Sequence, residues 1–277
     1  MREALLAIGP VAAAFATAAW IELRTRRARL DPPGFSDPLR RWAWLMILSG
    51  CLWISVFASL ASSGETGEVD LAAVPTWQLF ALHALFLATL AGWYLLGFGG
   101  WREEAGASGS LTVQLGLAAR SPLAEIGVGL VFGVGAWLVV LAGIVSLALL
   151  LSALGGQELL PQQPPAMIPW LAGQPIALRL GIALSAGVVE EIFFRGLLQP
   201  RVGVALSTAL FALAHAAYGQ PFLLVGVTLL SLLYAALVRW RQSVWAAMAA
   251  HTLFDAVQLL IVIPSVLEMW GAAPAGG

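Results

Sequence analysis

The sequence predicts an all-α membrane protein, a polytopic bundle of about eight transmembrane helices. Of its 277 residues, 60% are hydrophobic and only 10% are charged, and the mean hydropathy is +0.88. Soluble globular proteins carry about 25% charged residues, so this chain has too few to cover a surface in water. Apolar windows of about 20 residues, the length that crosses a hydrocarbon core of about 30 Å, recur along the chain. These observations exclude a soluble domain.

The apolar windows differ in length, and the lengths predict how each one meets the bilayer. In order, the eight windows cover residues 4–22, 42–60, 77–98, 124–153, 176–198, 203–217, 221–238 and 243–263. The fourth is long enough to tilt or to include a turn at the membrane surface, whereas the sixth is too short to span alone.

The arginines predict the orientation of the helices. Residues 23–41 hold six arginines, whereas residues 61–76 hold three acidic residues and no arginine. Basic loops stay in the cytoplasm, so we expect the first loop inside and the N-terminus outside. Ahead of the first window Arg2 is cancelled by Glu3, which favours a retained helix over a cleaved signal peptide. The sequence thus predicts a multi-pass protein of the bacterial inner membrane, with the lipid bilayer as its partner.

Charge and cysteine content exclude further classes. The chain has 14 basic and 15 acidic residues and a net charge of −1, so nothing attracts it to nucleic acid in general. Its one cysteine, Cys51, rules out an intramolecular disulfide and a multi-cysteine metal cluster.

Ionisable residues gather inside the last four windows. A charged side chain at the centre of a bilayer costs roughly 2.5–3.5 kcal/mol on insertion scales, so such groups are expected to face one another or a wet cavity. Polar contacts that merely join helices are the simpler explanation, but six such residues in less than a quarter of the chain favour a functional site. We therefore predict a catalytic cavity within the last four helices, reached from the cytoplasmic side. The six residues are Glu190, Glu191, Arg195, His215, His251 and Asp255.

The spacing of these residues predicts different roles for them. Glu191 and Arg195 stand at i and i+4, on one helix face, which indicates a structural pair. Glu190 is rotated by about 100° from Glu191, so we expect it to point elsewhere and to be the reactive carboxylate. His251 and Asp255 are again four residues apart, so the carboxylate can orient the imidazole or join it in binding a ligand.

Two chemistries fit these groups, and both hydrolyse an amide. In the first, His215, His251 and a carboxylate such as Glu190 bind Zn²⁺, which lowers the pKa of a bound water to about 7. In the second, no metal takes part. Glu190 is then the general base on water, and the histidines and Asp255 stabilise the oxyanion.

The ordered motifs resemble those of the CPBP family of intramembrane proteases, which includes the type-two CAAX prenyl proteases and bacteriocin-processing, Abi-like proteins. The family pattern is EExxxR, then FxxxH, then HxxxN or HxxxD, and the resemblance covers roughly residues 176–263. Each motif alone is weak, but all three in order on successive predicted helices are specific. They stand here as Glu190-Glu191 through Arg195, Phe211 through His215, and His251 through Asp255.

The resemblance implies peptide-bond hydrolysis inside the membrane. It carries a catalytic role to Glu190 and His215, and an oxyanion or ligand role to His251 and Asp255. We favour the metal-free route because no third neutral partner is evident that would close a zinc site around Glu190. Position 255 is Asp where the eukaryotic prenyl proteases have Asn, and a second carboxylate there keeps zinc as an alternative cofactor.

Function and domain organisation follow from where these motifs lie. We expect residues 1–175 to form helices without a catalytic motif that contribute to substrate choice, and residues 176–277 to form the catalytic bundle. The predicted function is an intramembrane endopeptidase acting on a membrane-associated or lipid-modified peptide. A proton- or ion-coupled transporter using the Glu and His cluster as a relay is the alternative, although polar residues confined to one half do not fit the repeats of transporters.

Two residues receive a simpler interpretation from the sequence. His83 stands alone on an apolar helix, and we expect a packed or interfacial histidine with no nearby partner. Phe211 lies one turn before His215 and is expected to pack there or to line the same cavity wall.

Overall fold

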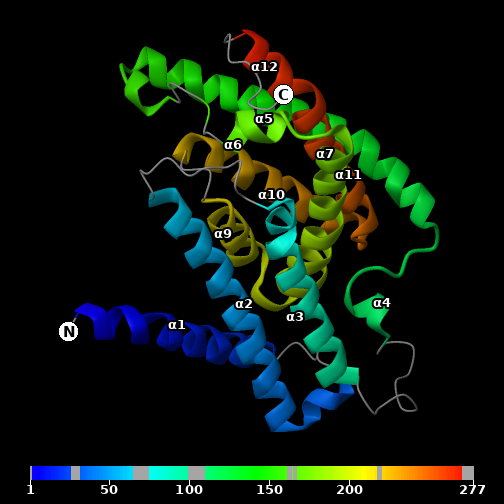
Figure 1. Ribbon diagram of the computed structural model, residues 1–277. Coiled ribbons are helices and arrows are strands. Elements are labelled where there is room, and N and C mark those ends of the chain that lie inside the picture. Colours follow the sequence, from blue (N-terminus) through cyan, green and yellow to red (C-terminus); the bar gives the residue numbers. More distant parts are fainter. Residues whose placement is uncertain are drawn as a thin grey trace.

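In the residues that it describes, the computed structural model consists of helices and their connections, and this confirms the all-α class (Figure 1). Those residues are 2–25, 32–64, 75–98, 110–160, 164, 167–216 and 220–269. The α-helices are α1 (Arg2–Thr25), α2 (Pro38–Gly64), α3 (Ala81–Phe98), α4 (Leu111–Gln114), α5 (Pro122–Ala153), α6 (Met167–Ala172), α7 (Ile176–Ser185), α8 (Gln199–Val202), α9 (Val204–Ala214), α10 (Pro221–Arg241), α11 (Trp245–Val257) and α12 (Ile263–Met269). Three short 3₁₀ segments are η1 (Pro33–Ser36), η3 (Thr76–Phe80) and η5 (Gln157–Leu159), and three π-helical segments are η6 (Ala186–Glu190), η7 (Ile192–Leu198) and η9 (Gln258–Val262).

Among the described residues, five helical stretches are long and apolar enough to cross a membrane. They match five of the eight predicted windows to within a few residues at most of their ends, and they identify a multi-pass membrane protein. The five stretches are Pro38–Leu60, Thr76–Phe98, Pro122–Ala153, Phe222–Arg241 and Trp245–Met269.

The other three windows are helical too, but each differs from a simple span. Window 4–22 lies within α1. Window 203–217 corresponds to α9, whose 11 residues measure about 16 Å at 1.5 Å per residue, too short to cross alone, as its length predicted. Window 176–198 lies in one continuous helix from α7 to α8, which carries too many charged residues to count as an ordinary apolar span.

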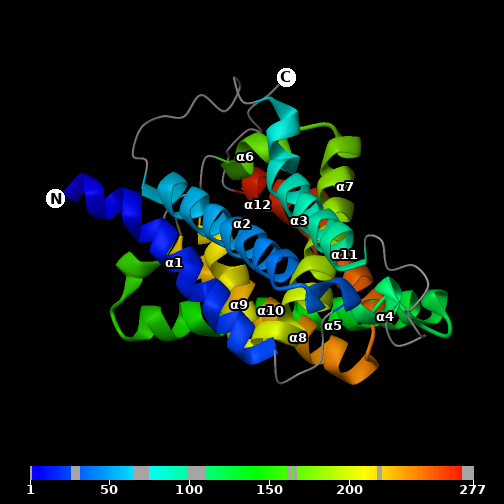
Figure 2. The same cartoon turned by 90° about the horizontal axis from the view of Figure 1, so that it is seen from below.

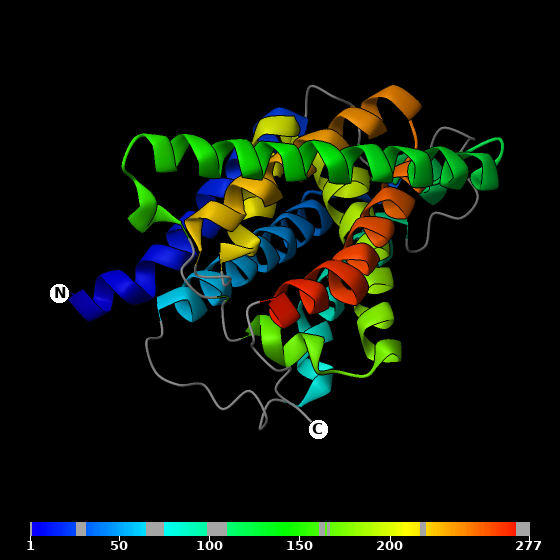
Figure 3. The same ribbon diagram turned by 90° about the horizontal axis from the view of Figure 1, so that it is seen from above.

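Helix α5 lies across the bundle instead of parallel to its neighbours, as the long green helix in Figure 3 shows. Its 32 residues extend for about 48 Å, whereas a bilayer core is about 30 Å thick. A helix of this length is long enough to cross the core at a tilt. Helix α5 is continuous, without the surface turn that was one expectation for the fourth window, and its tilt in a membrane stays a prediction.

Small residues bring α5 and α11 into close contact. Helices in lipid associate largely through small side chains that let their backbones approach. A Cβ atom on Gly133 would lie 3.1 Å from Ala250 Cα, and one on Gly129 would lie 2.8 Å from Ala249 Cβ and collide with the Ala246 carbonyl oxygen. The glycine pair on α5 thus sets the position of α11, the helix that carries His251.

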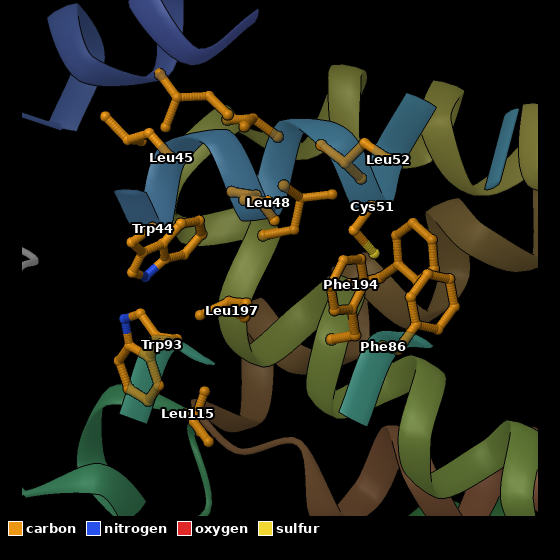
Figure 4. Close-up of a cluster of buried hydrophobic side chains, with 14 of the residues drawn as sticks. Trp44, Leu45, Leu48, Cys51, Leu52, Phe86, Trp93, Leu115, Phe194 and Leu197 are labelled. Atoms are coloured by element: carbon orange, nitrogen blue, oxygen red, sulfur yellow. The ribbon is translucent and has the colours of Figure 1, made fainter. Parts of the chain in front are cut away.

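The largest apolar core joins helices from both ends of the chain. Figure 4 shows Trp44 and Leu48 of α2 meeting Phe86 of α3 and Phe194 and Leu197 of the π-helical segment η7. This core crosses the boundary at residue 175 that separates the two predicted domains. The division at that residue stays a prediction, while the packing makes the two parts contact one another.

Ion pairs join neighbouring helix ends at two places in the bundle. Where α1 and α2 run beside each other (Figure 2), Arg41 pairs with Glu22 and donates a 3.0 Å hydrogen bond to Thr25 Oγ1. At the start of α5, Glu125 accepts two hydrogen bonds of 2.7 and 2.9 Å from Arg241, at the end of α10. The side of the membrane on which these ends lie stays a prediction, and the run of arginines at residues 26–29 lies outside the described residues.

We predict that Gly129→Ala lowers the thermal unfolding temperature of the purified protein in detergent by roughly 2–10 °C, because overpacking a tight contact costs about 1–3 kcal/mol. The matched control is Gly127→Ala on the same helix, where an added Cβ meets no atom within 4 Å. Its unfolding temperature should stay within about 2 °C of wild type. Equal effects of the two substitutions would contradict the proposed role of the α5–α11 contact.

Candidate active site

The six ionisable residues predicted from the sequence come from three neighbouring parts of the bundle. Glu190 ends the π-helical segment η6 and Arg195 lies in η7, while His215 terminates α9. His251 and Asp255 lie on α11, which packs against η6. The fold therefore assembles in space what the sequence placed in three separate motifs.

Glu190 lies between two imidazoles. Its Oε1 atom is 3.2 Å from His83 Nε2, and its Oε2 atom is 3.9 Å from His215 Nε2. Oε2 is buried and has no hydrogen-bond partner among the described residues. A carboxylate removed from water with one oxygen left unsatisfied is costly, so this atom is a candidate position for a bound water or a substrate group.

The ring of His215 has a defined orientation. Its Nδ1 donates a 2.7 Å hydrogen bond to the Phe211 carbonyl oxygen, and this bond puts the hydrogen of a neutral ring on Nδ1 and turns Nε2 toward Glu190. The two rings of this turn pack with centroids 4.5 Å apart. Phe211 is almost fully buried, so it supports His215 both through its backbone and through its ring.

Glu191 pairs with Arg195, as its spacing predicted, and it also contacts a second helix. The Arg195 Nε atom is 3.3 Å from Glu191 Oε2, and His251 Nδ1 donates to Glu191 Oε1 at 2.9 Å. Arg195 also donates from Nη2 to the carbonyl and hydroxyl oxygens of Ser231, and it lies 4.6 Å from the centre of the Phe211 ring. Glu191 thus connects the helix of the first motif to that of the third.

His251 has a carboxylate on each side. Nδ1 faces Glu191, and Nε2 is 3.5 Å from Asp255 Oδ2. Because ionised carboxylates only accept hydrogen bonds, this arrangement favours an imidazole that carries hydrogen on both nitrogens and therefore a positive charge. Asp255 lies beside His251 as its spacing predicted, the orienting role of Asp255 stays a prediction, and Glu191 makes a second contact with His251 that the sequence did not indicate.

The orientations of the His215, His251 and Glu190 side chains do not form the alternative zinc site. Both nitrogens of His251 face carboxylates, so neither lone pair is directed at a shared metal position. Across the described ranges, no group of three or more His, Cys, Asp or Glu side chains has the arrangement that a metal ion needs. The residues present therefore do not fit the zinc alternative.

His83 is packed, as expected, with 7% of its surface exposed, but the expectation that it has no nearby partner was wrong. Instead of standing alone, it contacts Glu190, and its Nδ1 atom is 2.8 Å from the Ser185 hydroxyl. His83 is 107 residues from Glu190 in sequence, so helical spacing could not connect them. A sequence signal did exist, because any ionisable residue within a membrane helix is a functional candidate by default.

Close packing brings Glu190 and Glu191 to α11. A Cβ atom on Gly187, one turn before them, would lie 2.6 Å from Thr252 N and 2.9 Å from the Met248 carbonyl oxygen. Any side chain here would push η6 away from α11. Gly187 is thus a positioning residue that spacing within the motifs did not reveal.

The predicted cavity stays a prediction, although the outer edge of the cluster is defined. The side chains of Glu190 and His251 are buried, whereas those of His215 and Asp255 are 18% and 25% exposed. Access to the buried carboxylate is therefore most direct past His215 and Asp255.

Comparison with known proteins locates the resemblance in this part of the chain. Residues 172–257 match the family model of the type II CAAX prenyl endopeptidase, Rce1-like. Uncharacterized protein YpbD of Bacillus subtilis (strain 168) is 34% identical over 77 residues, which are 27% of this chain and 41% of that relative. The similarity thus spans less than half of the length of the relative. No solved structure matches the chain significantly, and none of these comparisons favours the transporter alternative.

We predict that Glu191→Gln lowers the unfolding temperature in detergent by roughly 10 °C, because removing one partner of a buried ion pair costs about 3–5 kcal/mol. The substitution preserves the shape of the side chain while leaving the Arg195 charge without its partner. Glu158→Gln is the matched control, since it makes the same change at an exposed position. A Glu191→Gln protein as stable as this control would show that the ion pair is not structural.

Proposed function

From the match of residues 172–257 to the family model of the Rce1-like type II CAAX prenyl endopeptidases, we propose that this chain is an intramembrane endopeptidase. Its substrate is a peptide bond in a membrane-associated or lipid-modified protein or peptide. The observation that carries the proposal is the Glu190 carboxylate, held by His83 on one oxygen and turned toward His215 with the other.

The charges of the cluster support Glu190 as the reactive group. Arg195 and a doubly protonated His251 balance the negative charges of Glu191 and Asp255, with which they are paired. Glu190 is then the remaining carboxylate of the cluster, and its neighbours are the imidazoles of His83 and His215. A carboxylate that is not already in an ion pair with a cation can act as the base that accepts a proton.

In the proposed reaction, Glu190 and His215 hold the attacking water. The 3.9 Å between Glu190 Oε2 and His215 Nε2 is too long for a direct hydrogen bond, and one water can donate a hydrogen to each atom. Glu190 takes a proton as the water oxygen bonds to the carbonyl carbon of the substrate. The tetrahedral intermediate then expels the amine, and Glu190 returns the proton to its nitrogen.

His251 and Asp255 have supporting roles in this scheme. The positive charges of His251 and Arg195 favour the negative charge that develops on the carbonyl oxygen of the substrate. Asp255, at the exposed edge, orients His251. This division of roles follows the sequence prediction, and it uses Glu191 to hold His251 as well as Arg195.

The substrate and the location in the cell are also part of the proposal. A bacterial chain rarely meets prenylated proteins, so we favour processing of a secreted peptide or of a carboxy-terminal sorting segment. We propose that the protein lies in the bacterial inner membrane, with its N-terminus outside and the site reached from the cytoplasm. The reason is that residues 23–41 hold six arginines and residues 61–76 hold none, and basic loops stay in the cytoplasm.

The test is cleavage by the purified protein in proteoliposomes. Three fluorogenic peptides would be compared: a farnesylated CAAX peptide, the same peptide without the farnesyl group, and an unmodified transmembrane peptide. We expect Glu190→Gln and His215→Ala each to lower kcat/KM at least 100-fold, the scale of general-base catalysis. A strong chelator should change the rate less than about twofold, since the donors do not form a metal site.

Glu158→Gln is the matched control for the carboxylate change and should retain wild-type turnover. Unchanged cleavage by Glu190→Gln would refute the assignment of the base. Loss of activity in chelator, restored by added zinc, would refute the metal-free route while leaving the peptidase function intact.

A further inference from the structure

We infer that His83, on α3 and outside the family segment, is a positioning residue that holds the Glu190 carboxylate for catalysis, and that Ser185 holds His83 in turn. The inference rests on the proposed function and deepens it, because it makes the N-terminal part of the chain complete the site. It begins from the two nitrogens of one buried imidazole, each of which has a partner on the same neighbouring helix.

The hydrogen positions of this chain of contacts are mutually consistent. An ionised Glu190 can only accept, so His83 donates from Nε2 to Oε1 at 3.2 Å. A neutral His83 then presents a lone pair on Nδ1, which the Ser185 hydroxyl satisfies by donating at 2.8 Å. Each of the three groups therefore has the hydrogen that its neighbour requires, and no charge beyond that of Glu190 is needed.

The π turn explains how one imidazole can reach both residues. Ser185 and Glu190 are five residues apart, and in an α-helix they would point in directions about 140° apart, from 100° per residue. The segment between them, η6, is π-helical. Its hydrogen bonds close from residue i to i+5, which brings residues with this separation close to the same side. The π turn thus aligns Ser185 and Glu190 toward α3.

Aromatic packing holds α3 against this segment. Phe86, one turn after His83, stacks on Phe193 with ring centroids 4.2 Å apart and planes 16° apart, and it meets Phe194 edge to face at 5.4 Å. All three rings are buried. His83 itself is 7% exposed. The imidazole therefore lies on a helix that packing fixes relative to Glu190.

Holding one carboxylate oxygen determines where the other one points. The terminal torsion of a glutamate side chain is broad and roughly two-fold, so an unrestrained Glu190 could turn its oxygens away from His215. With Oε1 held by His83, Oε2 faces His215 Nε2. This is the arrangement in which a catalytic base is oriented by a third group, and the Ser185 hydroxyl sets the tautomer of that group.

The test compares His83→Leu with His83→Gln in the peptide-cleavage assay. Leucine removes the donor, so we expect kcat to fall roughly 10- to 100-fold while KM stays within about twofold. The amide nitrogen of glutamine can take the place of Nε2–H, so His83→Gln should retain kcat within about threefold of wild type. Ser185→Ala should lower kcat by a smaller factor than His83→Leu.

The matched control on the same helix is Thr89→Val, which removes a buried hydroxyl that bonds the Leu85 carbonyl oxygen of its own helix. It should keep wild-type kcat. If His83→Gln loses as much activity as His83→Leu, donation to Glu190 is refuted and His83 is a packing residue. Full kcat in His83→Leu beside an inactive Glu190→Gln would likewise overturn the inference and leave the proposed function standing.

A double-mutant cycle tests the contact without relying on activity. The unfolding temperatures of His83→Leu, Glu190→Gln and the double variant would be measured in detergent. Residues in direct contact give non-additive changes, so we expect the double variant to lose less than the sum of the two single losses. Additive losses would refute the His83–Glu190 contact even if no peptide were cleaved by any form of the protein.

Discussion

The cost of placing charged groups where water is scarce governs this structure. Ionisable side chains inside a membrane need partners of opposite charge or hydrogen-bonding groups. In the described part of the chain, Glu191 has both Arg195 and His251 as partners, and Asp255 has His251. In these pairs Arg195 and His251 are the cations, and Glu190 has the imidazoles of His83 and His215 as its neighbours. The same constraint that pairs the other charges thus singles out one carboxylate.

Such pairing requires helix backbones to come unusually close, and glycines and π turns make this possible. Gly187 lets η6 approach α11, and Gly129 and Gly133 let α11 approach α5. The π turns of η6 and η7 carry Glu190 and Arg195 and rotate their side chains away from the directions that an α-helix would give them. The positions of the charged groups therefore depend on residues that carry no charge.

Much of the bundle and part of the site follow from the sequence alone. Apolar length located the five apolar spans, and spacing of four residues identified the pairs Glu191–Arg195 and His251–Asp255, because these signals are local. The contacts of His251 with Glu191 and of His83 with Glu190 join residues 60 and 107 positions apart, and they depend on how helices dock. The π turn of η6 was equally hidden, since apolar periodicity does not distinguish it from an α-helical turn.

The proposed site therefore extends beyond the segment that is similar to the family. Residues 172–257 contain every polar group that the motifs suggested, yet none of the described residues of that segment bonds the Glu190 Oε1 atom. The holding contact comes from α3, which the aromatic packing of Phe86 on Phe193 joins to the segment. A helix that contributes both a core side chain and an orienting hydrogen bond cannot diverge freely from the segment it supports. The N-terminal part of the chain is in this sense part of the proposed reactive site, although no motif in its own sequence marks it.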